Sequence, residues 1–220
     1  MTDDGVAARA AALHADALVW DDHSGFEPDP AADLDQLDRW RQAGVDHLSV
    51  NVGYDVMTWQ QTIRSLADFR HRIGIRPDRY LLVDTADDVL RARSAGLLGI
   101  TFDLEGMNAL NGDVAMVGFY HRLGVRQMLF AYNRNNAAGG GCHDADIGLT
   151  PFGRAVVAEM NRVGMTVDAS HCGYRTSLEA MGVSARPGRR RGDRLAAAPS
   201  PGILAAERGL RHRPIPKRDP

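Results

Sequence analysis

The stretch VAMVGFYHRLGVRQMLFAYNRNN, residues 114–136, contains one complete copy of the pattern that decides the fold. Its first ten residues have apolar side chains at helical spacing, Gly124 follows them, and residues 125–131 form a largely apolar run. Glycine accepts the left-handed conformation in which many helices end, and a short apolar run after it is typical of a buried strand. We therefore predict a helix over 114–123, a glycine cap, a strand over 125–131 and a polar loop from Tyr132.

The same unit recurs on both sides of this stretch. Gly44, Gly96 and Gly164 follow amphipathic segments as Gly124 does, and Thr150-Pro151 fits a helix N-cap with proline at the first helical position. The predicted strands are 17–20, 45–52, 80–83, 99–104, 125–131 and 165–169, and the predicted helices are 33–43, 57–73, 87–95, 114–123, 151–163 and one that starts near Tyr174. This alternation predicts an α/β fold with a parallel sheet.

Six such units predict an incomplete (β/α)8 barrel of the TIM type, with six of its eight βα units, rather than an open doubly wound sheet. No G-x-G-x-x-G motif follows the first predicted strand, which argues against a dinucleotide-binding fold. We expect the partial barrel to span residues 1–186 and a separate tail to span residues 187–220.

The composition is typical of a soluble globular domain. The chain has 220 residues, of which 44% are hydrophobic, and this is enough for one sizeable core. No apolar run approaches the roughly 20 residues that a membrane helix needs, and the N-terminus is acidic where a signal peptide is basic. These features predict a cytoplasmic protein without a membrane partner. The two cysteines are too few for a disulfide scaffold, and their spacing fits no zinc finger.

The charge is divided unevenly along the chain. Residues 186–220 carry +7 and residues 1–185 carry −9, although the whole chain has a net charge of only −2. The tail is rich in Arg, Pro, Ala and Gly, as GC-rich DNA translated out of frame would be. It lacks the aromatic residues on which bases stack, so we expect no nucleic-acid partner. We predict a disordered tail of unrelated origin, produced by a frameshift close to Pro187, and resequencing the locus would test this.

Polar residues that could bind a metal follow three of the predicted strands. His23 follows the first, Glu105 follows the fourth and His171 follows the sixth. Because active sites of (β/α) barrels lie at the carboxyl ends of the strands, we expect these three side chains to converge. Imidazole and carboxylate groups are common zinc ligands, so the pattern indicates metal-assisted hydrolysis. Asp168, inside the sixth predicted strand, is interpreted as a residue that supports a ligand.

Longer motifs extend this interpretation. They include FDLEG at 102–106, AYNRNN at 131–136, GLTPFG at 148–153, EMNRVGM at 159–165 and VDASH at 167–171. With these motifs, the chain from about Leu18 to Met181 resembles the membrane (renal) dipeptidase family of zinc metallopeptidases. The resemblance implies a (β/α) barrel in which two zinc ions and a metal-activated water hydrolyse the peptide bond of a dipeptide. It implies His23, Glu105 and His171 as metal ligands and Tyr132 as a substrate contact, and a homo-oligomer is possible.

Two departures from the family pattern bear on activity. The family's first motif is His-x-Asp, whereas this chain has His23-Ser24-Gly25, so that only Asp21 or Asp22 could replace the missing carboxylate. The family also continues beyond Pro187 into a strand that ends in Ser-His, and this chain does not. The leading hypothesis is therefore a zinc-dependent dipeptidase, and the alternative is an inactive remnant that folds partially or with a partner.

Overall fold

The computed structural model describes residues 3–24 and 28–188, which form six strands, seven α-helices and two short 3-10 helices. The strands are β1 (Trp20–Ser24), β2 (His47–Tyr54), β3 (Tyr80–Leu82), β4 (Leu98–Glu105), β5 (Val125–Leu129) and β6 (Thr166–Asp168). The α-helices are α1 (Asp3–Asp16), α2 (Leu37–Gln42), α3 (Trp59–Gly74), α4 (Ala86–Ser94), α5 (Ala115–Arg122), α6 (Pro151–Val163) and α7 (Tyr174–Val183), and the 3-10 helices are η1 (Leu34–Gln36) and η2 (Asn108–Leu110).

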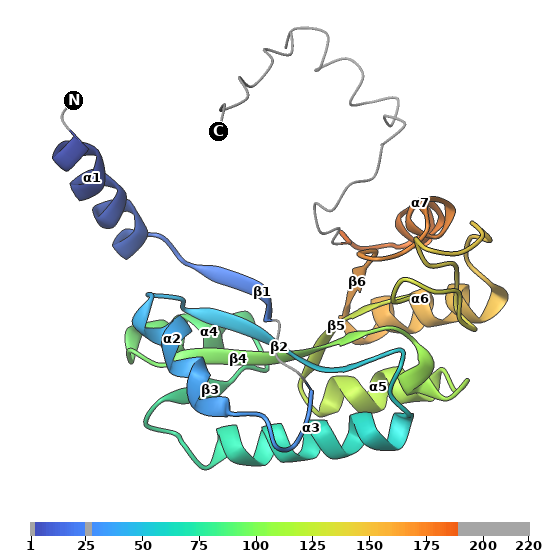
Figure 1. The fold of residues 1–220 in the computed structure, drawn as a ribbon, viewed down its shortest axis with the longest axis horizontal. Helices are drawn as coiled ribbons and strands as arrows, with labels where there is room; N and C mark the ends of the chain where they lie inside the picture. Colours follow the sequence, from blue (N-terminus) through green and yellow to red (C-terminus); the bar gives the residue numbers. More distant parts are fainter. Residues whose placement is uncertain (1–2, 25–27, 189–220) are drawn as a thin grey trace, which may run out of the picture.

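All six strands belong to one parallel sheet, and the described chain is an incomplete TIM-type barrel (Figure 1). Five strands follow one another in the order β1-β2-β4-β5-β6. Strand β3 pairs with residues 98–100 of β4, and β5 pairs with residues 102–105 of the same strand. The prediction of a parallel α/β sheet is therefore confirmed. Strand β3 lies outside this order of five strands and pairs with β4.

The two faces of the central strands differ in chemistry. Alternate residues of β2 and β4, among them Leu48, Val50, Ile100 and Phe102, are fully buried in the apolar core. Burial of one such side chain contributes about 1.5–3 kcal/mol. Figure 1 shows α3 and α5 running along this side of the sheet. The residues that alternate with them point to the opposite face, the inner face of the half-barrel.

The inner face is polar. In the register between β2 and β4, Ser49 lies opposite Thr101 and Asn51 lies opposite Asp103, and all four side chains are buried. Buried polar groups are costly unless they are hydrogen-bonded, so a face of this kind is held by a specific network of contacts. The candidate site lies next to this network, at the carboxyl ends of the strands.

Most predicted elements agree with the observed ones, and the agreement is best where a cap marks the boundary. Helix α6 has the predicted bounds, because Thr150 accepts a hydrogen bond from the Gly153 amide at one end and Gly164, with φ 85°, ends the helix at the other. A proline at the first helical position needs no backbone hydrogen bond, so it fits this start.

The first strand was predicted too early in the chain. It runs over 20–24 rather than 17–20, because its register with β2 places Trp20 opposite His47 and Ser24 opposite Val50. Asp21, Asp22 and His23 are therefore strand residues rather than residues after a strand. Helix α1 was not predicted, because its exposed, alanine-rich residues lack an apolar stripe, although alanine favours helices.

The predicted tail lies almost wholly outside the described residues, which end at Gly188 shortly after α7. Among the helices of the described ranges, none is both long enough and apolar enough to cross a membrane.

Candidate metal centre at the carboxyl ends of the strands

The structure brings the three predicted ligands together around one carboxylate oxygen. The Nε2 atom of His23 lies 3.6 Å from Oε1 of Glu105, and the Nε2 atom of His171 also lies 3.6 Å from that oxygen. The three side chains come from β1, the end of β4 and the segment after β6, and all are mostly buried. Glu105 is thus the point at which the two histidines meet.

Asp103 fixes the ring of His23. Its Oδ1 atom accepts a hydrogen bond from Nδ1–H of His23 at 3.0 Å, and its carboxylate also accepts bonds from Ser49 Oγ at 2.8 Å and Asn51 Nδ2 at 3.0 Å. The Asp103 side chain is only 1% exposed. Because a carboxylate only accepts, Nδ1 carries the proton, and the lone pair of Nε2 faces Glu105.

Asn133 has the same role for His171. Its side-chain Oδ1 accepts a hydrogen bond from Nδ1–H of His171 at 2.9 Å, which again leaves Nε2 toward Glu105. Both residues have left-handed backbones, with φ 63° at Asn133 and φ 58° at His171. A left-handed backbone is uncommon outside glycine and is enriched at functional sites. The ring of Tyr132 lies beside His171, with 4.7 Å between the ring centroids.

The donor set fits a zinc ion. Two ligand atoms that share a tetrahedral zinc, each about 2.0–2.2 Å from the metal, lie about 3.3–3.6 Å apart. Both histidine–glutamate separations are at the upper end of this range. Within residues 3–24 and 28–188, however, no group of three His, Cys, Asp or Glu side chains is arranged to hold a single ion. The candidates form two pairs that share one oxygen.

The two aspartates before His23 accept hydrogen bonds from neighbouring groups. Asp21 accepts hydrogen bonds from Nε1 of Trp40 at 2.9 Å and from the His23 amide at 3.2 Å. The Asp22 side chain accepts from Nε1 of Trp20, and the Asp22 carbonyl accepts from Gln127 at 2.7 Å. Asp168 accepts from the Ser170 amide at 2.8 Å, which suits a supporting role for the segment that leads to His171.

Asp55, which the sequence analysis did not single out, follows β2 and forms hydrogen bonds with residues at or after the ends of β4 and β5. Its backbone N–H donates to the Glu105 carbonyl at 2.9 Å, and its carboxylate accepts from the Tyr132 amide at 3.0 Å, from Nδ2 of Asn136 at 2.8 Å and from the Asn108 amide at 3.0 Å. Burial raises the pKa of this carboxyl group, and the hydrogen bonds oppose that rise.

Gly106 makes this close packing possible. It has φ 123°, and a Cβ atom there would lie 2.1 Å from the carboxyl group of Asp55. Any other residue would push Asp55 away from the end of β4.

Comparison with known proteins decides the family. The profile of the membrane dipeptidase family (peptidase family M19) matches residues 10–188. The chain belongs to the membrane dipeptidase family. The match includes all three candidate ligands.

Individual relatives agree with this assignment. The chain is 37% identical to dipeptidase tcpJ from Claviceps purpurea over 113 residues, which cover 50% of this chain and 27% of that protein. An amidohydrolase structure from Pseudomonas aeruginosa is 30% identical, with a TM-score of 0.73, and the match covers 81% of this chain and 53% of that one. A Rhodobacter sphaeroides metallo peptidase, solved with a phosphinate mimic of the dipeptide L-Ala-D-Ala, has the same fold, with a TM-score of 0.61, 21% identity and coverage of 69% and 53%.

The match therefore spans about half of each of these two solved structures and about a quarter of the curated dipeptidase. The comparisons therefore show the family and the fold of the matched part of the chain.

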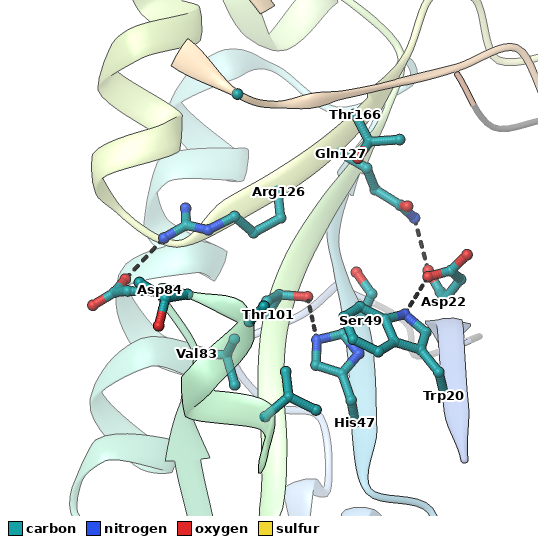
Figure 2. Close-up of a pocket in the computed structure, with 14 residues that line it drawn as sticks. Trp20, Asp22, His47, Ser49, Val83, Asp84, Thr101, Arg126, Gln127 and Thr166 are labelled. Atoms are coloured by element: carbon teal, nitrogen blue, oxygen red, sulfur yellow. Dashed lines mark hydrogen bonds and ion pairs between the residues drawn. The ribbon is translucent and has the colours of Figure 1, made fainter. Parts of the chain in front are cut away.

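A separate hollow of 220 Å³ lies between the starts of β1, β2 and β6 and the segment that follows β3 (Figure 2). Trp20, His47 and Thr166, which are among the residues that line it, are each the first residue of a strand. Burial lowers the pKa of His47 to about 4, although Asp21 opposes this shift, and the Nε2 atom of His47 lies 3.1 Å from Oγ1 of Thr101. In (β/α) barrels this end of the strands contributes stability rather than catalysis, so we do not place the dipeptidase site there.

Proposed function

We propose that this member of the membrane dipeptidase family is a zinc-dependent dipeptidase that hydrolyses the peptide bond of a dipeptide. The observation that carries the proposal is the shared Glu105 oxygen, which lies 3.6 Å from an oriented Nε2 atom on each side. A carboxylate between two imidazoles can hold one ion or bridge two. Membership of a metallopeptidase family supports the same chemistry.

Each residue has a defined task in this proposal. His23, Glu105 and His171 would hold zinc, and Asp103 and Asn133 keep the two imidazoles in the tautomer that binds metal. Bound zinc supplies a Lewis acid that polarises the peptide carbonyl and lowers the pKa of water. Tyr132, whose ring lies beside His171, would contact the substrate.

The test is a metal analysis of the purified full-length chain joined to a dipeptidase assay. We expect bound zinc and dipeptide hydrolysis that a chelator abolishes and added zinc restores. His171→Ala should lower both, whereas His143→Ala, a change at an exposed loop histidine, should leave both unchanged. Equal zinc content in all three proteins would show that the site is wrong.

A non-catalytic remnant is the alternative. It is supported by the sheet, because β1 and β6 each pair with only one other strand among the described residues and are therefore edge strands. If the zinc-loaded chain hydrolyses no dipeptide above background, the alternative is favoured. A cytoplasmic location, a homo-oligomeric state and the lack of nucleic-acid or membrane partners remain predictions of the sequence.

A further inference from the structure

The loop after β5 contacts both residues that form the β6 side of the candidate metal centre. We call its glycine-rich part, residues 139–143, the glycine strap. The Cys142 amide donates a hydrogen bond to the His171 carbonyl at 2.9 Å, and the His143 amide donates to the Asn133 carbonyl at 2.8 Å. The strap is therefore joined through its backbone to both partners of the Asn133–His171 side-chain hydrogen bond.

A side-chain contact of the strap reaches the same hydrogen bond. The thiol of Cys142 donates to Oδ1 of Asn133 at 3.5 Å, and this oxygen also accepts from Nδ1 of His171 at 2.9 Å. A thiol is a weak donor, but both donors require the oxygen rather than the nitrogen of the amide. The strap thus favours the amide orientation that keeps the proton on Nδ1 of His171.

The other side of the strap is fixed to the start of α7. The Gly140 amide donates to Oγ1 of the fully buried Thr176 at 2.8 Å, and the Gly140 carbonyl accepts from the Gly173 amide at 2.7 Å. Gly141 also forms an antiparallel bridge with Cys172. Because α7 begins three residues after His171, the strap, the helix start and the candidate ligand form one connected structure.

This close packing requires glycine in the strap. A Cβ atom at Gly141 would lie closer than 3.0 Å to backbone atoms of Asn133 and Arg134. The backbone of Gly141 is not left-handed, so the requirement concerns space rather than conformation. At Gly182, in α7, a Cβ atom would meet nothing within 4 Å. The two positions therefore allow the same substitution to be compared in a tight and in an open place.

We propose that the glycine strap positions the candidate metal centre, and that the missing side chain of Gly141 lets Asn133 reach Nδ1 of His171. The inference rests on the proposed dipeptidase function, in which His171 holds zinc. A side chain at position 141 would push the Asn133 backbone, and with it the amide oxygen, away from the ring. The imidazole then loses the acceptor that selects the tautomer with a free Nε2 lone pair.

The first measurement needs no metal. Long-range ¹H–¹⁵N correlation spectra of the metal-free full-length chain show which ring nitrogen of each histidine carries the proton, and His171→Ala identifies the His171 signals. At about pH 8, where a free histidine is neutral, we expect the proton on Nδ1 of His171 in the wild type. The matched control Gly182→Ala should retain this tautomer, and Gly141→Ala should give a mixture of both.

The second measurement is a double-mutant cycle on zinc affinity, determined by competition with a chromophoric chelator. Gly141→Ala should lower the affinity about 10-fold, as the loss of a supporting residue does. In a chain that already contains Asn133→Gly, it should cause no further loss, because the strap acts through the Asn133 side chain. A change that merely loosened the fold would lower the affinity in both backgrounds.

A milder variant covers the case in which Gly141→Ala does not fold. Thr176→Val keeps the shape of the side chain but removes the oxygen that accepts from the Gly140 amide, so it should shift the His171 signals in the same direction. Circular dichroism and urea titration check that each variant is folded.

The proposal is overturned if the wild-type His171 carries its proton on Nε2, or if the tautomer is unchanged in both Gly141→Ala and Thr176→Val. Losses of zinc affinity that add in the double-mutant cycle would also overturn it. Failure of the proposed function gives a different result. If the tautomer depends on Gly141 but the wild-type chain binds no zinc, the positioning role stands and the dipeptidase proposal fails.

Discussion

His23 and His171 reach the same oxygen of Glu105 over the same distance, but different kinds of structure hold them in place. His23 lies in β1, at the irregularity between Asp21 and Ser24, and its partner Asp103 lies inside β4, where it is paired with Asn51 of β2 and Gln127 of β5. His171 lies after β6, and its partner Asn133 lies in the loop after β5. Both loop residues have left-handed backbones, whereas neither strand residue does.

This difference shows two ways to orient a histidine that is a candidate metal ligand. On the β1 side, a buried carboxylate that accepts three hydrogen bonds is part of the folded sheet, so loss of the carboxylate should affect both stability and metal binding. On the β6 side, the half-buried amide of a loop residue, Asn133, holds the ring. Each left-handed residue costs roughly 1–3 kcal/mol. Loss of the Asn133 amide should therefore weaken metal binding with little effect on the stability of the fold.

Removal of the shared oxygen should have the largest effect. Glu105→Ala deletes the contact of both histidines at once, so we expect zinc affinity to fall by more than about 100-fold, beyond the 10–100-fold loss typical of a supporting residue. Competition with a chromophoric chelator measures the affinity. Glu159→Ala, on α6, is the control, and equal affinities in the two variants would refute the shared site.

Asp103→Asn tests the strand-based partner. The new amide cannot accept from all three of its donors, so we expect a loss of about 1–3 kcal/mol in the free energy of unfolding, together with a 10–100-fold loss in zinc affinity. Urea titration without metal measures the first quantity, and chelator competition measures the second. A loss of zinc affinity with unchanged stability would contradict the role given to the sheet.

Asn133→Gly tests the loop-based partner. Glycine adopts φ 63° without strain, so the variant removes the side-chain oxygen while the backbone is retained. We expect zinc affinity to fall about 10-fold and the free energy of unfolding to change by less than about 1 kcal/mol. If stability falls as much as in Asp103→Asn, the two sides do not differ in the way proposed.

His47, the first residue of β2, is a third buried histidine, and its partner is the hydroxyl of Thr101 rather than a carboxylate or an amide. Burial lowers its pKa to about 4 in the folded state, from 6.5. The unfolded chain therefore binds the proton more readily between these values, and stability is lost as pH falls through this window.

We expect His47 to contribute a fall of about 1 kcal/mol in the free energy of unfolding between pH 6.5 and 5.5. Urea titrations of the chelator-treated wild type and of His47→Gln at both pH values measure it. Equal pH dependence in the two proteins would show that His47 is not buried in its neutral form.

The sequence predicted best what depends on neighbours along the chain. Helix α6 is marked at both ends, by Thr150-Pro151 and by Gly164, and its bounds agree with the prediction. The residue types at the strand ends indicated the ligand candidates, and the structure places them together. Asp103 could have been found as well, because it lies two residues before Glu105 and so shares its face of the strand.

Other features carry no local signal. Asp55 becomes important only because the ends of β2, β4 and β5 meet. Asn133 lies in a motif that the sequence analysis quoted, but its contact with His171 exists only because the loop after β5 lies beside the segment after β6. The position of β3 depends on its pairing with β4. The start of β1 was missed for the same reason, since its register with β2 outweighs the apolar residues that precede it.

The alternation of strands and helices, the family motifs and the chemical types of the candidate ligands could be predicted from the sequence, because caps and side-chain periodicity act within a few residues. The folded structure was needed to see which nitrogen of each histidine faces Glu105 and which residue holds each ring. These depend on contacts between distant strands and loops, and such contacts form only when the sheet is assembled.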